Sequence, residues 1–149
     1  MKNSNRSLFA IIILLSVFAL VSCSKKKKSE LVWTANLPTI GSQSSPRAAD
    51  LNSDGTLDIV MGAGKNEYQE SDQGILAFDG KTGGILWQQK SSDQVYGSAT
   101  FYDVNDDDVV DVFIGGRSPQ FKALDGKTGK LIWEFQYDKH KHHPVLRFA

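Results

Sequence analysis

Two similar stretches, FDGKTGGILW at residues 78–87 and LDGKTGKLIW at residues 124–133, are identical at six of their ten positions. In each, an Asp-Gly pair opens the stretch, a Thr-Gly pair follows, and an apolar run ends in tryptophan. Glycine adopts positive φ angles without strain, and aspartate accepts hydrogen bonds from nearby backbone N–H groups, so both residues favour tight turns. The two stretches therefore predict the same β-hairpin turn twice.

A second pair of similar stretches precedes these turns, DLNSDGTLD at residues 50–58 and DVNDDDVVD at residues 103–111. Self-similarity of this kind indicates a fold built from repeated units. The first unit is longer because it contains the polar stretch KNEYQESDQ at residues 65–73, which we interpret as an insertion in a connecting loop. With Tyr68 inside it, this segment is either a loop that contacts a partner or a merely tolerated insertion.

Each unit contains four short runs rich in Val, Ile, Leu and aromatic residues, which is the composition of β-strands. Leu57, Ile59 and Met61 define one face of such a run by their period of two, and Val60 is apolar on the other face. No stretch beyond the N-terminal apolar run has helical periodicity. The predicted strands are 46–51, 56–62, 74–78 and 84–89 in the first unit, and 96–104, 109–115, 120–124 and 131–136 in the second.

The acidic stretches resemble the calcium loop of FG-GAP (VCBS) repeats in integrin-type propellers, and the turns resemble the repeat of quinoprotein-like (PQQ-like) propellers. Four strands in a unit of this length are typical of a β-propeller blade. The resemblances imply an all-β fold of two four-stranded antiparallel β-propeller blades, at about residues 31–87 and 88–133, with a leading strand near residues 31–37. Residues 134–149 would begin a third blade, so the ring is expected to be incomplete.

The quinoprotein likeness also implies that Trp87 and Trp133 pack between blades. Carbohydrate stacking is the other use that exposed tryptophans could have. By this resemblance, we interpret Trp87 and Trp133 as core residues.

Oxygen-bearing side chains stand at alternating positions of each acidic stretch, and neither stretch contains Cys or His. Hard oxygen ligands of this kind favour calcium or magnesium, and a loose set of many oxygens favours calcium. Acidic surface turns without metal are the alternative interpretation. By the resemblance, the calcium ligands are Asp50, Asn52, Asp54, Thr56 (carbonyl) and Asp58 in the first loop, and Asp103, Asn105, Asp107, Val109 (carbonyl) and Asp111 in the second.

The sixth position of the loop differs between the two copies, with Gly55 in the first and Asp108 in the second. A sharp turn there needs a positive φ, which aspartate tolerates less well than glycine. We therefore expect the second site to be the weaker one. In both loops the predicted role of calcium is to stabilise the fold, with no part in catalysis.

The first residues predict an export signal. The apolar run 8–21 follows a basic start and is shorter than the about 20 residues that a membrane-spanning helix needs. It ends in Leu-Val-Ser-Cys23, which resembles the lipobox of bacterial lipoproteins. The resemblance implies a signal peptide at residues 1–22, a lipid on Cys23 and a Lys-rich tether within residues 23–30; a plain secretory signal is the alternative.

Lipidation would attach the protein to a membrane of the bacterial cell envelope, at the outer membrane or cell surface in preference to the inner membrane. Cys23 is the single cysteine of the 149-residue chain, so no disulfide within the chain is possible. Packing and metal binding would then have to supply the stability.

The remaining features point away from catalysis and from nucleic acid. The formal net charge is zero, so bulk electrostatics give no support to a nucleic-acid partner. No nucleophile–base pair or phosphate loop stands out, and HKHH at residues 140–143 is interpreted as a solvated loop. We expect a non-enzymatic calcium-binding module of an envelope lipoprotein that binds or scaffolds an unknown protein or glycan. The alternatives are a fragment of a quinone-dependent (PQQ-type) dehydrogenase or of an outer-membrane-assembly propeller lipoprotein.

Overall fold

The computed structural model describes residues 30–116, 120–138 and 143–149, with only the backbone described from 136 to 138 and from 143 to 148. The chain divides into two units, residues 1–31 and 32–149, and the fold is that of the second unit. The predicted signal peptide, Cys23 and nearly all of the tether lie outside the described residues. The described residues contain no helix long and apolar enough to cross a membrane.

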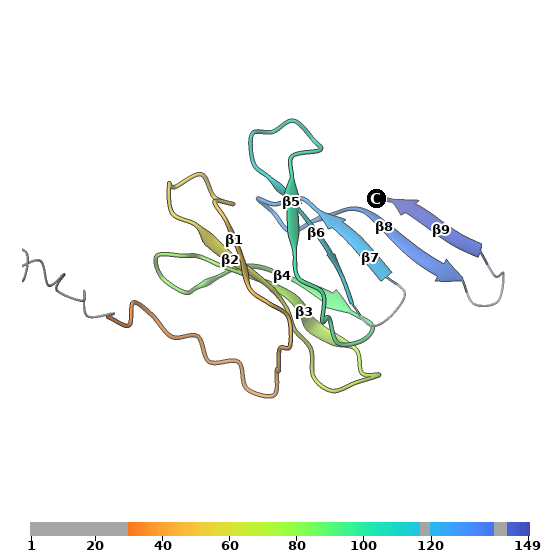
Figure 1. Ribbon diagram of the computed structural model, residues 1–149, viewed down its shortest axis with the longest axis horizontal. Helices are drawn as coiled ribbons and strands as arrows, with labels where there is room; N and C mark the ends of the chain where they lie inside the picture. The colour runs from red at the N-terminus through yellow and green to blue at the C-terminus, as the bar shows by residue number, and fades with distance from the viewer. Residues whose placement is uncertain (1–29, 117–119, 139–142) are drawn as a thin grey trace, which may run out of the picture. The chain divides into compact units, whose positions relative to one another are not determined.

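Two antiparallel sheets form the second unit (Figure 1). In both, the strands lie side by side in sequence order. The first sheet contains β1 (Arg47–Ala49), β2 (Asp58–Gly62), β3 (Ser71–Phe78) and β4 (Ile85–Ser91). The second contains β5 (Thr100–Tyr102), β6 (Asp111–Gly115), β7 (Gln120–Leu124), β8 (Leu131–Asp138) and β9 (His143–Phe148). The predicted all-β fold of two four-stranded antiparallel units is confirmed, and the second sheet has one additional strand.

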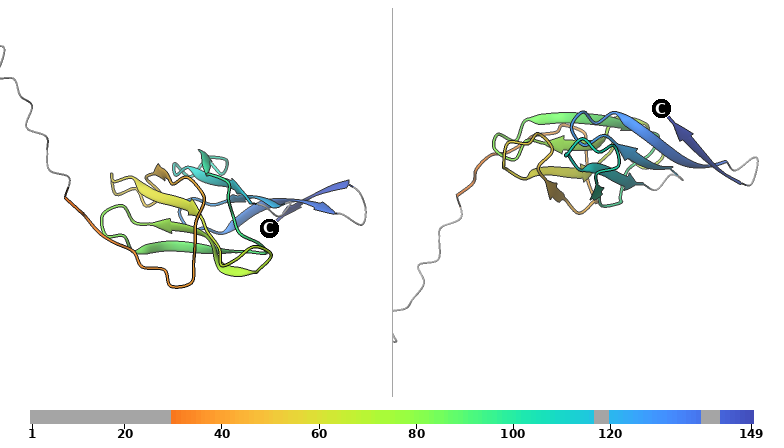
Figure 2. Two further views of the ribbon diagram at one scale, coloured as in Figure 1. Left: turned by 60° about the horizontal axis from the view of Figure 1, so that its bottom comes forward. Right: turned by 90° about the horizontal axis from the view of Figure 1, so that it is seen from above.

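That additional strand lies in the segment 134–149, which the sequence analysis assigns to a third blade. Here β9 pairs antiparallel with β8, from Trp133↔Phe148 to Asp138↔His143. The β8–β9 hairpin extends away from the first sheet (Figure 2). In the described residues this segment therefore widens the second sheet.

The polar stretch 65–73 is only partly a loop, because β3 begins inside it at Ser71. Ser71 is buried and pairs with Ser91, and a bulge separates this pair from the next one at Ile75. The inserted residues therefore lengthen a strand as well as a connection. Leu57 also differs from expectation, since it precedes β2 and is 60% exposed.

The two Asp-Gly-Lys-Thr-Gly turns are built alike. In the first, Asp79 Oδ1 accepts hydrogen bonds from the backbone N–H groups of Lys81 and Thr82, at 2.9 and 2.7 Å. In the second turn, the Thr128 N–H donates the corresponding hydrogen bond to Asp125 Oδ1. The last glycine of each turn, Gly83 or Gly129, has a φ of 72° or 69°. The prediction that these turns use glycine at positive φ is confirmed.

A tryptophan from the preceding segment docks on each turn. Trp33 Nε1 donates a hydrogen bond to the Gly80 carbonyl at 2.8 Å, and Trp87 Nε1 donates one to the Gly126 carbonyl at 2.7 Å. Each indole lies against the last glycine of its turn, so closely that a Cβ atom on Gly129 would lie 2.5 Å from Trp87 Cδ2. We call these two contacts the tryptophan locks.

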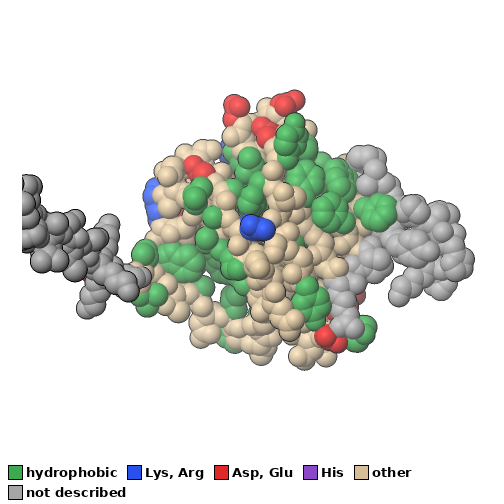
Figure 3. Space-filling view, viewed as in Figure 1, with side chains coloured by type: hydrophobic (Ala, Val, Ile, Leu, Met, Phe, Trp, Pro, Cys, Tyr) green, Lys and Arg blue, Asp and Glu red, His purple; other side chains and the backbone are tan. Residues whose placement is uncertain are grey.

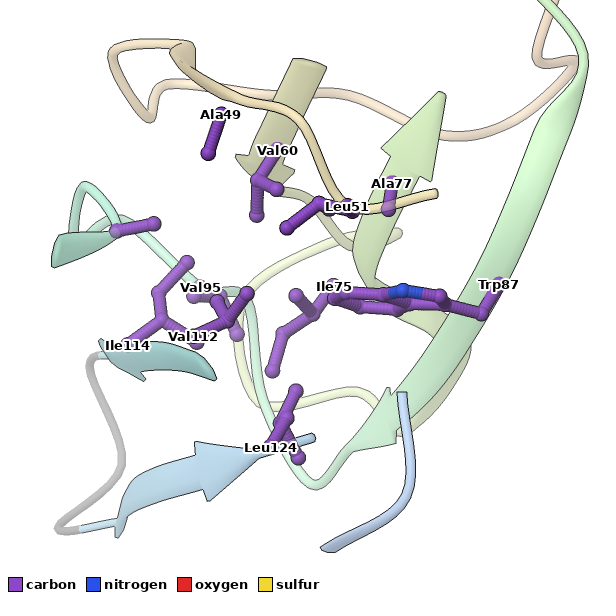
Figure 4. Close-up of a cluster of buried hydrophobic side chains, with 11 residues drawn as sticks. Ala49, Leu51, Val60, Ile75, Ala77, Trp87, Val95, Val112, Ile114 and Leu124 are labelled. Carbon is purple, nitrogen blue, oxygen red and sulfur yellow. The ribbon is translucent and has the colours of Figure 1, made fainter. Parts of the chain in front are cut away.

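The second lock lies in the hydrophobic core that joins the two sheets (Figure 4). Trp87 is only 7% exposed, which confirms that it packs between blades. Burial of apolar area is the dominant favourable term in such an interface. The core includes Val60, Ile75 and Ala77 from the first sheet and Val112, Ile114 and Leu124 from the second.

Gly129→Ala should lower the free energy of unfolding by about 2–5 kcal/mol, because alanine is strained at positive φ and its Cβ would overlap the Trp87 ring. Gly55→Ala is the matched control, since Gly55 has a φ of 80° and nothing within 4 Å of the added Cβ. The Gly55→Ala control should lower the free energy of unfolding only by the cost of placing alanine at a positive φ, about 1–2 kcal/mol. Urea unfolding of the two variants measures the difference, and equal losses would contradict the lock.

Candidate functional site

The predicted metal ligands lie in two connecting loops. Acidic loop 1 (residues 50–58) joins β1 to β2, and acidic loop 2 (residues 103–111) joins β5 to β6. In loop 1, Asp50 Oδ1 accepts a hydrogen bond from the Asp54 N–H at 3.1 Å, and Asp50 Oδ2 accepts one from the Gly55 N–H at 2.9 Å. The first ligand position therefore folds the loop back on itself.

Loop 2 closes in the same way. The Asp103 carboxylate accepts hydrogen bonds from the N–H groups of Asp106 and Asp108, at 2.8 and 3.1 Å. The sixth positions, Gly55 and Asp108, have φ angles of 80° and 65°. The expected sharp turn is present in both loops, and in loop 2 an aspartate has to adopt the left-handed conformation.

The ninth residue of each loop is a buried carboxylate that joins the loop to the neighbouring turn. Asp111 is 0% exposed, and it accepts hydrogen bonds from the N–H groups of Val104 at 2.9 Å and Gly126 at 3.1 Å. Asp58 is equally buried, and it accepts hydrogen bonds from the N–H groups of Leu51, in its own loop, and of Gly80. A buried carboxylate is costly unless it is hydrogen-bonded, and these two are. We call Asp58 and Asp111 the brace carboxylates.

The third ligand position also contacts the turn. Asn52 Nδ2 donates a hydrogen bond to Asp79 Oδ2 at 3.3 Å, and Asn105 Nδ2 donates one to Asp125 Oδ2 at 3.1 Å. Each acidic loop is therefore fastened to its turn by an asparagine as well as by a brace carboxylate.

The brace carboxylates connect the acidic loops to the tryptophan locks. Gly126 donates its N–H to Asp111 and accepts the Trp87 indole N–H at its carbonyl. In the first blade, Gly80 donates its N–H to Asp58 and accepts the Trp33 indole N–H at its carbonyl. A single glycine residue thus joins each acidic loop to the contact between neighbouring segments.

The two loops differ in how their negative charge is balanced. Lys81 Nζ lies 2.9 Å from Asp54 Oδ2 in loop 1. This hydrogen bond lowers the pKa of Asp54 and raises the pKa of Lys81. The pKa of Asp79 is also lowered, chiefly by the hydrogen bond from the Thr82 N–H. Within the described part of the chain, Lys127, the counterpart of Lys81, forms no such ion pair with loop 2.

The loops suit calcium in the chemistry of their donors, because each carboxylate oxygen has two lone pairs and can bind a cation while accepting an N–H. They do not form a preformed cage. Among the residues that the structure describes, no three carboxylate, histidine or cysteine groups converge closely enough to hold a metal ion. The N–H groups of Thr56 and Val109, whose carbonyls are the predicted ligands, donate hydrogen bonds to Asp54 and Asp107, at 2.8 and 3.0 Å.

A comparison with protein families matches residues 10–140 to the family described as outer membrane protein assembly factor BamB, whose repeats are of the PQQ type. The chain belongs to this family. Both blades lie within the match, so the PQQ-like β-propeller repeat predicted from the turns is confirmed. No curated protein matches the chain. The likeness to FG-GAP (VCBS) repeats and the lipid on Cys23 stay predictions.

This BamB-family chain also has a polar cavity of about 240 Å³ that the sequence analysis missed. Lys122 Nζ donates a hydrogen bond there to the Lys90 carbonyl at 2.9 Å, and burial lowers the pKa of Lys122. Its lining comes from segments far apart in the sequence, so no local pattern could indicate it. The lining includes Glu70, Asp72, Lys90, Ser91, Lys122 and Glu134.

Asp111→Asn should lower the free energy of unfolding by about 2–3 kcal/mol, because an amide has one acceptor oxygen and its NH₂ group would face a backbone N–H. Asp106→Asn is the control, since Asp106 is exposed and asparagine also tolerates its φ of 57°. The control should leave stability nearly unchanged. Denaturant titration compares the two, and similar losses would refute the brace role.

Proposed function

We propose that this chain is a non-enzymatic propeller module of a lipid-anchored envelope protein, and that it acts as a scaffold in the assembly of outer-membrane proteins. The observation that supports this most directly is the family match over residues 10–140, because the family is described as an outer-membrane protein assembly factor. The lipobox-like sequence ending at Cys23 supports attachment to a membrane. The lipid would keep the blades at the membrane surface.

The exposed aromatic residues support a role in binding another protein. Tyr68 is 75% exposed and Tyr102 is 69% exposed. Tyrosine is enriched in protein interfaces relative to the rest of the surface. The Tyr68 N–H donates a hydrogen bond to Asp93 Oδ1 at 2.8 Å, which holds the polar stretch 65–73 against the end of the first blade. We assign partner contact to this stretch.

Deletion of the gene in its native host should lower the amount of folded β-barrel protein in the outer membrane, measured by heat-modifiable migration in gels. The wild-type gene should restore that amount. Cys23→Ser should restore less of it, because the protein would lose its lipid attachment. Normal β-barrel levels after deletion would overturn the scaffold role. Oxidation of an alcohol by the purified protein with added quinone and calcium would overturn the non-enzymatic assignment.

We also propose that the acidic loops bind calcium, with Asp50, Asn52, Asp54 and Asp58 as the side-chain ligands of loop 1 and Asp103, Asn105, Asp107 and Asp111 as those of loop 2, completed by the carbonyls of Thr56 and Val109. The charge difference between the loops supports this. In loop 1 the ammonium of Lys81 already balances Asp54, whereas within the described residues loop 2 has no such partner. An ion entering loop 1 would have to displace that ammonium, so loop 2 should bind first, which reverses the order expected from Gly55 and Asp108.

Calcium at ten times its dissociation constant should raise the free energy of unfolding by about 1.4 kcal/mol for each site. Asp107→Asn should weaken the first binding step, and Lys81→Gln should strengthen the second, because the competing ammonium is gone. Isothermal titration calorimetry and melting with and without chelator measure these effects. Absence of binding heat, together with melting unchanged by chelator, would contradict calcium binding and leave the scaffold proposal standing.

A further inference from the structure

The polar cavity lies between two blades that are both present in the chain. Ile114, Lys122 and Glu134 form one cross-strand row of the second sheet. Ile114 belongs to the core that joins the two sheets, so this row faces the first blade. The opposite wall comes from the first residues of β3 and the last residues of β4. The other face of the second sheet, which carries the partly buried Trp133, has no part in the cavity.

The cavity and the acidic loops lie at opposite ends of the sheets. The acidic loops lead into β2 and β6, whereas the cavity is lined by the first residues of β3 and β7, which run the other way. In Figure 3 the acidic side chains at the top of the view lie over the connection between β5 and β6. The volume of about 240 Å³ is below the about 300–1,000 Å³ of pockets for drug-sized ligands, so the cavity suits a smaller molecule.

Two hydrogen bonds join the walls of the cavity. Lys122 Nζ of the second sheet donates one to the Lys90 carbonyl of the first sheet at 2.9 Å. Ser92 Oγ, just after the first sheet, donates the other to Gln120 Oε1 of the second sheet at 3.1 Å. The walls are thus held in place by contacts across the interface, and a molecule in the cavity would touch both blades.

Lys122 supplies a half-buried positive charge to the cavity. Its ammonium has three N–H donors, and among the described residues the Lys90 carbonyl is the acceptor that it contacts. Burial is the chief cause that lowers the pKa of Lys122; the carboxylate of Glu134 opposes this change and the ammonium of Lys90 adds to it. A pKa lowered by burial means that the surroundings compensate the charged form poorly. An anionic oxygen placed beside Lys122 would supply that compensation.

Ser91 supplies a hydroxyl group to the same part of the cavity. Ser91 is only 7% exposed and pairs across the strands with Ser71. Within the part of the chain that the structure describes, Ser91 Oγ is the one buried side-chain oxygen or nitrogen without a hydrogen-bond partner. Buried polar groups nearly always have such a partner. Turning this hydroxyl to another staggered rotamer, toward a bound group, would break none of the hydrogen bonds found here.

The rim of the cavity carries the opposite charge. Glu70 and Asp72 line it, and both residues are exposed. Carboxylates accept hydrogen bonds and repel anions, so a simple anion attracted by Lys122 would be repelled at the rim. A simple cation would meet the reverse situation. A sugar presents apolar C–H faces as well as hydroxyls, and the described lining has no aromatic ring to receive them.

We propose that this cavity binds a small zwitterion of the amino-acid type, with its carboxylate at Lys122 and Ser91 and its ammonium at Glu70 and Asp72. The ligand would touch both sheets and would therefore stabilise the contact between the blades. This binding goes beyond the scaffold role. It is also independent of calcium, because the acidic loops lie at the other end of the sheets.

The test uses the full chain, purified from membranes in mild detergent. Isothermal titration calorimetry measures binding of the protein amino acids, each added singly. At least one should bind with a millimolar or lower dissociation constant and raise the melting temperature. Its N-acetyl derivative lacks the ammonium and its carboxamide lacks the carboxylate, so each should bind about tenfold more weakly or worse.

Phosphate and glucose serve as probes for a simple anion and for a sugar. Both should bind more weakly than the amino acid. The proposal is overturned if no amino acid binds, if either probe binds more tightly, or if the two derivatives bind as well as the amino acid does.

Lys122→Met removes the ammonium and keeps an unbranched side chain, so it should weaken binding of the amino acid by about tenfold or more. Lys127→Met is the matched control, because Lys127 is exposed in the turn between β7 and β8, at the other end of the sheet. The control should bind as the wild type does. Equal binding by folded Lys122→Met and wild type would overturn the proposal.

Ser91→Ala separates binding from folding. The hydroxyl has no partner, so alanine should leave the free energy of unfolding unchanged or slightly raised. Binding of the amino acid should nevertheless weaken by about threefold or more. Urea unfolding and calorimetry measure the two effects. A loss of stability without a loss of affinity would mean that Ser91 serves the fold and would contradict its role in the site.

Discussion

The hydrogen bond from a tryptophan indole to a glycine carbonyl in the adjoining turn is the contact on which the other features depend. Trp87 reaches Gly126 only because Gly129 has no side chain beneath the ring. The lock fixes the distance between two small sheets, and the apolar residues around it can then be buried. A sheet with an apolar face has to bury that face against a neighbouring element. In a repeat architecture, stability is the sum of the units and of the interfaces between them, and here the interface has a defined polar centre.

The acidic loops are tied to that centre by backbone contacts that need no metal. Asp111 satisfies an N–H in its own loop and an N–H of the turn, so the carboxylate is compensated although it is buried. The other carboxylates of the loops lie nearer the solvent, and among the described residues an ion pair balances one of them in loop 1, through Lys81, and none in loop 2. A ligand that orders either loop therefore acts on a loop that is already hydrogen-bonded to the neighbouring turn. The free energy of binding would then also stabilise the contact of the tryptophan with Gly126 or Gly80.

The fold could be predicted from the sequence because the decisive residues act locally. Glycine at positive φ and aspartate capping the same turn mark the hairpins, and the tryptophan that follows at a fixed distance marks the core. The roles of Asp58 and Asp111 beyond metal binding could not be predicted, since each depends on a turn that lies 22 or 15 residues further along the chain. One signal was available: a charged residue directly preceding an apolar strand is expected to be satisfied by neighbours when it is buried. The partial exposure of Trp133 depends on which surface lies opposite, and no local pattern contains that information.

The wide separation of each tryptophan from its acceptor has a consequence for biosynthesis. Gly126 lies 39 residues after Trp87, and Gly80 lies 47 residues after Trp33. At about 5–20 residues per second, a ribosome needs about 2–8 s to make the 39-residue segment, and the indole has nowhere to dock in that time. The nascent chain thus emerges with the apolar sheet surface around Trp87 uncovered. Chaperones that keep such a polypeptide from aggregating have to act within that interval, and they have to release it when the next hairpin arrives.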